Sequence, residues 1–144
     1  MKHIATGVDA RQLVRACYFG PLGERSFGAN RGTGYNAGIA DKAAYYREAN
    51  EQMLVCALLE DVAVLDNLDA ILSGRGIDPS SIGPNDFAQS LGYPGQPDHP
   101  EVAKTMQELT RRIRQSGRTI QLDVMQGAWV SDMLPDAGRR ILSS

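Results

Sequence analysis

Two acidic side chains stand directly after apolar segments of the chain, and these are the residues best placed to do chemistry. Glu60 follows the apolar run 53–59, and Asp86 follows a weaker apolar stretch over residues 77–82. If both stretches are neighbouring parallel strands, about 4.8 Å apart, the two carboxylates emerge at the same edge of a sheet. Such a pair suits a hard divalent cation, because Mg²⁺ and Mn²⁺ take a few carboxylate oxygens and keep positions for water and substrate.

The same two positions also suit a purely structural role. Glu60 would then cap the helix that follows it, and Asp86 would cap a helix beginning at Phe87. Acids are common at helix starts because the first backbone N–H groups have no partner within the helix. Spacing alone leaves both interpretations open.

Apolar periodicity predicts the elements that position these acids. It predicts an amphipathic helix over residues 9–17 with Asp9 as its N-cap, and Asp41 is placed to cap a second helix over 42–51. The run 53–59 predicts a strand buried on both faces. Further along, the pattern predicts a helix ending near Gly74, a weaker strand over 77–82, a turn over 83–86, a helix over 102–113, a strand over 119–124, a short helix to Leu134 and a last strand over 139–142.

Strand and helix patterns alternate regularly along the chain. Parallel neighbours need a helical crossover between them, so the fold class is predicted as α/β, with a parallel sheet covered by helices. The length of 144 residues predicts a single domain over residues 1–144. The stretch between Gly20 and Gly38 holds six glycines and is predicted to be a long glycine-rich loop.

Composition and charge argue against several classes of protein. The hydrophobic share of 42% and the net charge of −2 are ordinary for a soluble domain, and the scattered basic residues predict no nucleic-acid partner. No apolar run approaches the ~18 residues that span a bilayer, and the start resembles no signal peptide, so a cytoplasmic protein without a membrane partner is expected. Cys17 and Cys56 form no CxxC pair and are predicted to be reduced packing residues.

Four segments of the sequence together carry a family resemblance. They are GPLGERSFG, YYREANEQMLVCALLE, NLDAILSGRGID and IGPNDFAQSLGYPGQPDHPEV, in that order. They are similar to consecutive blocks of the HpcH/HpaI aldolase/citrate lyase family, the class II pyruvate aldolases that include 2,4-dihydroxyhept-2-ene-1,7-dioate aldolase. The resemblance covers residues 9–117 well, and it implies a partial (β/α)8 TIM barrel of about the last four β/α units.

The resemblance implies an enzyme, specifically a lyase of the class II, divalent-metal-dependent aldolase type. Glu60 and Asp86 would bind Mg²⁺, Mn²⁺ or Co²⁺, and the bound cation stabilises the enolate charge that grows on the keto oxygen. The partners implied are pyruvate or another 2-keto acid, together with an aldehyde. The substrate-binding residues implied by the same motifs are Gly83, Pro84, Asn85 and Arg25, with backbone amides near Asn85 and Asp86 holding the substrate carboxylate.

The chain also departs from the family pattern. A whole barrel needs ~250 residues, and the resemblance begins at the helix before the fifth strand, so the family's catalytic His and substrate-contacting Arg are expected to be absent. The catalytic base is therefore unknown, because His3 and His99 do not align with that His. Leu58 stands where the family commonly has Gln, and Asp61 where Thr or Ser is usual. A partial barrel leaves sheet edges without partners, which predicts a homo-oligomer or a complementary barrel half.

Two interpretations besides an active lyase stay open. The chain is either an active lyase or a truncated, catalytically impaired relative that acts as a metal-binding, keto-acid-binding or assembly component. A third interpretation takes Gly32, Gly34 and Gly38 as a dinucleotide-binding loop, although no predicted strand leads into it.

Overall fold

A computed structural model describes residues 4–124 of the chain. His3, Trp129 and the helix and strand predicted after residue 124 lie outside the described residues. The elements are the α-helices α1 (Gly7–Cys17), α2 (Lys42–Glu51), α3 (Val64–Leu72), α4 (Pro84–Ser90), α5 (Pro100–Gln115) and α6 (Gln121–Val124), the 3-10 helix η1 (Arg31–Asn36), and the strands β1 (Ala57–Leu59), β2 (Pro79–Ile82) and β3 (Thr119–Ile120).

The strands form a parallel sheet in the order β1-β2-β3, which confirms the predicted class. Leu59 pairs with Ile82 in the β1–β2 ladder, and Ser80 pairs with Ile120 in the β2–β3 ladder. α3 makes the first crossover, and α4 and α5 make the second. All three strands therefore point their carboxyl ends to the same side of the sheet.

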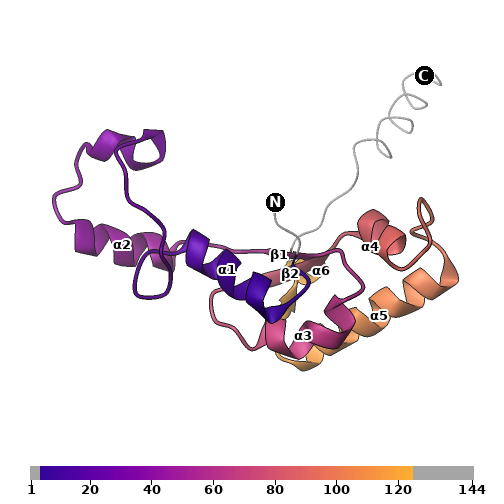
Figure 1. Cartoon of the computed structure of the whole chain (residues 1–144). Coiled ribbons are helices and arrows are strands. Elements are labelled where there is room, and N and C mark those ends of the chain that lie inside the picture. Colours follow the sequence, from indigo (N-terminus) through magenta and orange to yellow (C-terminus); the bar gives the residue numbers. More distant parts are fainter. Residues whose placement is uncertain (1–3, 125–144) are drawn as a thin grey trace, which may run out of the picture.

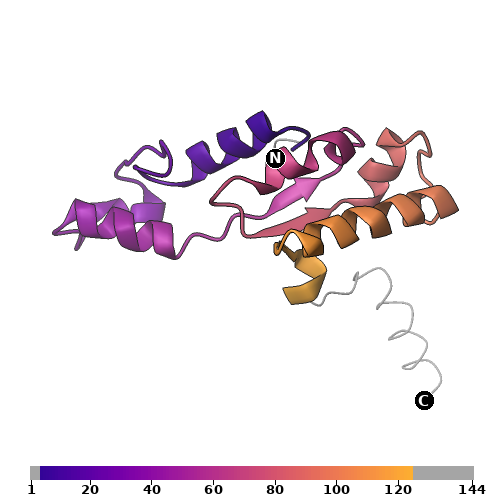
Figure 2. The same cartoon turned by 90° about the horizontal axis from the view of Figure 1, so that it is seen from below.

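One face of the sheet is covered and the other is open within the described residues. Ala57 and Leu59 are fully buried, and Ser80 and Ile120 are 1% exposed, because they face a core built from α1, α3 and α5. In Figures 1 and 2 these three helices lie alongside the strands. The alternate residue Leu58 is only half-buried. The prediction that this strand is buried on both faces is therefore wrong for the part of the chain described.

All three strands are shorter than their sequence patterns predict. The first predicted strand began at residue 53, but Leu54 is 69% exposed and the ladder starts only at Ala57. Its partner strand begins at Pro79, which has no N–H to extend the ladder further. The alternating pattern over 119–124 likewise becomes a two-residue strand followed by α6, because pairing with β2 ends at Ile120.

The predicted N-cap of the first helix is wrong, and the predicted N-cap of the second helix is correct. Asp9 is not the N-cap of α1. That cap is Thr6, whose Oγ1 accepts from the Asp9 N–H at 3.2 Å while the Asp9 carboxylate accepts from the Thr6 N–H at 3.0 Å. Asp41 caps α2 as predicted, with Oδ1 accepting from the Ala43 N–H at 2.8 Å.

α2 and η1 extend away from the sheet in both views (Figures 1 and 2). Four aromatic rings gather at this segment, and the closest pair is Phe19 with Tyr46, stacked at 4.3 Å between centroids. Asn50 anchors α2 to the chain after α1, because its side chain both accepts from and donates to the backbone of Phe19, at 2.8 and 3.0 Å. The glycine-rich stretch predicted as a loop contains η1, and every strand of the described chain comes after it. The dinucleotide-loop interpretation needs a strand that leads into Gly32, Gly34 and Gly38, and no strand precedes them within residues 4–124.

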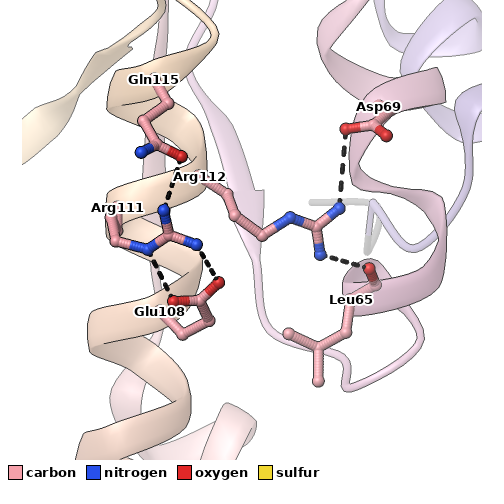
Figure 3. A network of polar contacts seen from close by, with 6 residues as sticks. All are labelled: Leu65, Asp69, Glu108, Arg111, Arg112 and Gln115. Carbon is pink, nitrogen blue, oxygen red and sulfur yellow. Dashed lines mark hydrogen bonds and ion pairs between the residues drawn. The ribbon is translucent and has the colours of Figure 1, made fainter.

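Arg112 fastens α5 to α3 on the covered face (Figure 3). Its Nη1 donates to the Leu65 carbonyl at 2.7 Å, and its Nη2 lies 3.5 Å from an Asp69 carboxylate oxygen. Arg111 instead pairs with Glu108 along the exposed side of α5. Arg112 thereby links the two crossover helices α3 and α5.

The described chain contains no helix long and apolar enough to cross a membrane. Both cysteines are free of disulfides, as predicted. Cys17 is half-buried, but Cys56 is exposed and is not the packing residue that the sequence suggested.

Candidate functional site

The side chain of Glu60 lies over Gly83 at the carboxyl ends of β1 and β2. Each is the first residue after its strand, and the Gly83 N–H donates to the Leu59 carbonyl at 3.2 Å, so the two segments leave the sheet side by side. A Cβ on Gly83 would lie 2.8 Å from Cγ and 3.1 Å from Oε1 of Glu60. A larger residue at position 83 would occupy the space that the Glu60 side chain fills and would displace that side chain.

Asp86 lies in the first turn of α4, the helix that begins directly after Gly83. The prediction of an open turn over 83–86 is therefore wrong. Pro84 is the first helical residue, and a proline is favoured there because its missing N–H would have no helical partner in any case. The structure thus brings the Glu60 side chain to the turn from which the Asp86 helix starts, and Asp86 itself is exposed.

The interpretation in which both acids cap helices does not describe these positions. The N-caps of α3 and α4 are Ala63 and Gly83, and neither makes a side-chain capping bond. The turn before α3 is held instead by Asp61, whose Oδ1 accepts from the Ala63 N–H at 2.8 Å. Neither Glu60 nor Asp86 is therefore the N-cap residue of these helices, but Asp86 lies in the first turn of α4, where an acid interacts favourably with the start of the helix.

Ser90 supports the site in a way that the sequence did not indicate. Its hydroxyl accepts from the Val62 N–H at 2.9 Å, across 28 positions in the chain, and so ties the turn after Glu60 to the end of α4. A serine near a helix end has no distinctive local signal. Only the packing of α4 beside the β1–α3 turn makes the contact possible.

The donor chemistry of the rim fits a hard divalent cation. Carboxylate oxygens are the ligands that Mg²⁺ and Mn²⁺ prefer, and Mg²⁺ sites often use one or two carboxylates together with water and substrate oxygens. Over residues 4–124 no group of three or more His, Cys, Asp or Glu side chains comes together to hold a metal ion.

The other predicted substrate-binding residues lie in two different places. Pro84 and Asn85 stand at the start of α4, where they line a groove of about 1080 Å³ whose other wall is α5. Arg25 lies in the aromatic segment, with its guanidinium carbon 4.8 Å from the centroid of the Phe19 ring and its backbone N–H donating to Tyr18. Pro84 and Asn85 belong to the turn that contacts Glu60, whereas Arg25 lies in the segment between α1 and α2.

His99 has a structural position at the start of α5. Its ring stacks on Tyr93 at 3.9 Å between centroids, and its Nδ1 accepts from the Glu101 N–H at 3.3 Å. The imidazole is thus the N-cap of α5.

Known proteins are similar to this chain in sequence. The chain matches the family model described as HpcH/HpaI aldolase/citrate lyase over residues 3–137. It is 40% identical over 115 residues to the 2-keto-3-deoxy-L-rhamnonate aldolases of Salmonella typhi and Salmonella newport (strain SL254), which covers 80% of this chain and 42% of those proteins.

Solved structures agree with the match in sequence. The HpcH/HpaI aldolase from Desulfitobacterium hafniense DCB-2 superposes with a TM-score of 0.71 and 26% identity, covering 96% of this chain and 52% of that one. An HpcH/HpaI aldolase/citrate lyase family protein from Burkholderia cenocepacia J2315 gives 0.70 and 30%, covering 81% and 46%.

The fold is of the α/β class, in which ligands bind beyond the carboxyl ends of the parallel strands. The family match is more specific, and the chain belongs to the HpcH/HpaI aldolase/citrate lyase family. It spans about half the length of the relatives that it matches.

Proposed function

We propose that the chain is part of a (β/α)8 barrel and carries the metal-binding rim of a carbon–carbon lyase that acts on 2-keto acids. The observation that carries this proposal is the Glu60 side chain seated over Gly83, beside the first turn of the Asp86 helix. It is supported by membership of an aldolase/citrate lyase family and by the likeness to 2-keto-3-deoxy-L-rhamnonate aldolases.

Glu60 and Asp86 would hold the cation, which we expect to be Mg²⁺, Mn²⁺ or Co²⁺. When bound, such a cation stabilises negative charge that develops on the keto oxygen during carbon–carbon cleavage. Ser90 keeps the turn after Glu60 in place, and Gly83 gives the carboxylate its room. The backbone N–H groups at the start of α4, near Asn85, would orient the substrate carboxylate. The predicted substrate contact of Arg25 stays a prediction.

Proton transfer needs a group that we do not assign within residues 4–124. His99 is engaged as the cap of α5 and stacks on Tyr93. We expect the base to come from another subunit of a homo-oligomer or from a complementary barrel half.

The alternative function is a binding or assembly component without turnover. Two observations favour it. Leu58, two residues before Glu60, is apolar and half-buried where the family commonly has Gln, and Asp61 is engaged in holding the turn before α3. Neither residue then contributes a polar group to the reaction, although metal and keto acid would still bind.

Calorimetric titration of Mn²⁺, with and without pyruvate, tests the site directly. Binding that the keto acid strengthens, and that Glu60→Gln and Asp86→Asn each weaken by at least about tenfold, is the expected result. Asp66→Asn is the matched control, because Asp66 is an exposed acid in the first turn of the neighbouring helix α3. Equal Mn²⁺ binding by all four proteins would rule the site out.

Exchange of the methyl protons of pyruvate into heavy water, followed by NMR, separates the two functions. An active lyase exchanges these protons in the presence of Mn²⁺, and the exchange disappears in Glu60→Gln. A protein that binds Mn²⁺ and pyruvate without any exchange is the binding component.

A further inference from the structure

Two neighbouring serines of β2 face opposite sides of the sheet. Ser80 is 1% exposed and pairs with the fully buried Ala57, on the face covered by helices. Ser81 is half-buried and pairs with the half-buried Leu58, on the open face. Because side chains alternate along a strand, Ser81 shares its face with the position of Gly83 two residues on, over which Glu60 lies.

The Ser81 hydroxyl is uncommitted within the described residues. It takes part in none of the side-chain hydrogen bonds of residues 4–124. Its cross-strand neighbour Leu58 offers no polar atom, so a ligand group that reaches this position meets one hydroxyl beside an apolar surface.

The direction of β2 indicates which end of a keto acid would reach Ser81. Under the proposed function, the substrate carboxylate lies toward the first turn of α4, which follows Gly83 in the chain. The keto oxygen lies toward Glu60. The carbon on the other side of the ketone therefore points back along β2, and Ser81 precedes Gly83 by two residues, about 6.6 Å along the strand.

We propose that Ser81 is a specificity-determining residue of this site, whose hydroxyl binds a hydroxyl group on the carbon next to the ketone. The site would then prefer a 3-hydroxylated 2-keto acid to one that ends in a methyl group. This inference rests on the proposed function. A site that hydrogen-bonds a substrate hydroxyl discriminates against the analogue that lacks it, because the protein group is otherwise left without a partner.

The test is calorimetric titration of the Mn²⁺-loaded protein with hydroxypyruvate and with pyruvate. The unsubstituted protein should bind hydroxypyruvate about tenfold more tightly, the scale of one good hydrogen bond. Ser81→Ala should bind the two acids equally. Ser80→Ala is the matched control, since it removes the same hydroxyl from the adjacent residue on the covered face, and it should keep the preference.

Two outcomes overturn the inference and are distinguishable. If pyruvate binds and Glu60→Gln abolishes that binding, but the preference is absent or survives Ser81→Ala, the role of Ser81 is wrong and the proposed site stands. If neither acid binds the Mn²⁺-loaded protein, the proposed function fails and the inference fails with it.

Discussion

Replacing Gly83 by alanine isolates the contact that shapes the candidate site. The backbone of Gly83, with φ −86° and ψ 100°, is open to any residue, so the substitution acts through the new methyl group alone. That methyl would sit 2.8 Å from Cγ of Glu60, whereas an ordinary contact is 3.4 Å or longer. The Glu60 side chain must therefore swing away, since it is the flexible partner and the β2–α4 turn is fixed by its ladder and helix.

The expected result is weaker metal binding in a protein that is as stable as before. Displacing a ligand by altering its support typically lowers metal affinity roughly 10- to 100-fold. Replacing glycine by alanine at a compatible backbone restricts the unfolded chain and adds about 0.4–1 kcal/mol of stability, which offsets the local crowding. The assay is Mn²⁺ titration by calorimetry, together with thermal unfolding followed by circular dichroism.

Gly74→Ala is the matched control for this prediction. Its added Cβ would meet only the Ile71 carbonyl oxygen, at 3.8 Å, so Mn²⁺ binding should not change. If Gly83→Ala binds Mn²⁺ as tightly as the unsubstituted protein while Glu60→Gln does not bind it, the reasoning from the Glu60–Gly83 contact is refuted.

Three further predictions concern stability. Arg118 donates to three backbone carbonyls between the end of α3 and the start of β2, at 2.7 to 3.3 Å. Arg118→Met should therefore lower the free energy of unfolding in urea by about 2 kcal/mol. Arg75→Met, at an exposed position, should leave this free energy almost unchanged. Thr6→Ala removes the cap of α1 and should cost about 1 kcal/mol, while Thr6→Ser should keep most of the stability; equal losses in both would contradict the capping role. A hydrogen bond from Arg111 lowers the pKa of Glu108 below its usual value of 4.5. The stabilisation from this pair is therefore present above that pH and is lost as the pH falls through the lower folded-state pKa. Arg111→Met should reduce this loss of stability at low pH, measured as urea unfolding midpoints from pH 6 to pH 3.

Much of the local structure could be predicted from the sequence, because its determinants lie within a few residues of one another. Asp41 and the residues after it specify the bounds of α2, since capping and helical periodicity involve neighbours three or four positions apart. The same holds for the apolar face of α5. Four sequence segments in the family's order, the most specific of them beginning IGPND, indicated the family that the comparison confirmed.

What the tertiary structure alone decided depends on contacts between residues far apart in the chain. The pattern over 53–59 could not show that only one face of β1 is covered, because the covering helices come from both earlier and later segments. Nor could an alternating pattern show that β3 stops at Ile120, where its ladder with β2 ends. The close approach of Glu60 to Gly83, and the opposite environments of Ser80 and Ser81, follow from the parallel register of two strands joined by α3. A chain's local pattern specifies which residues can face a partner, but the register of the sheet determines which partner they meet.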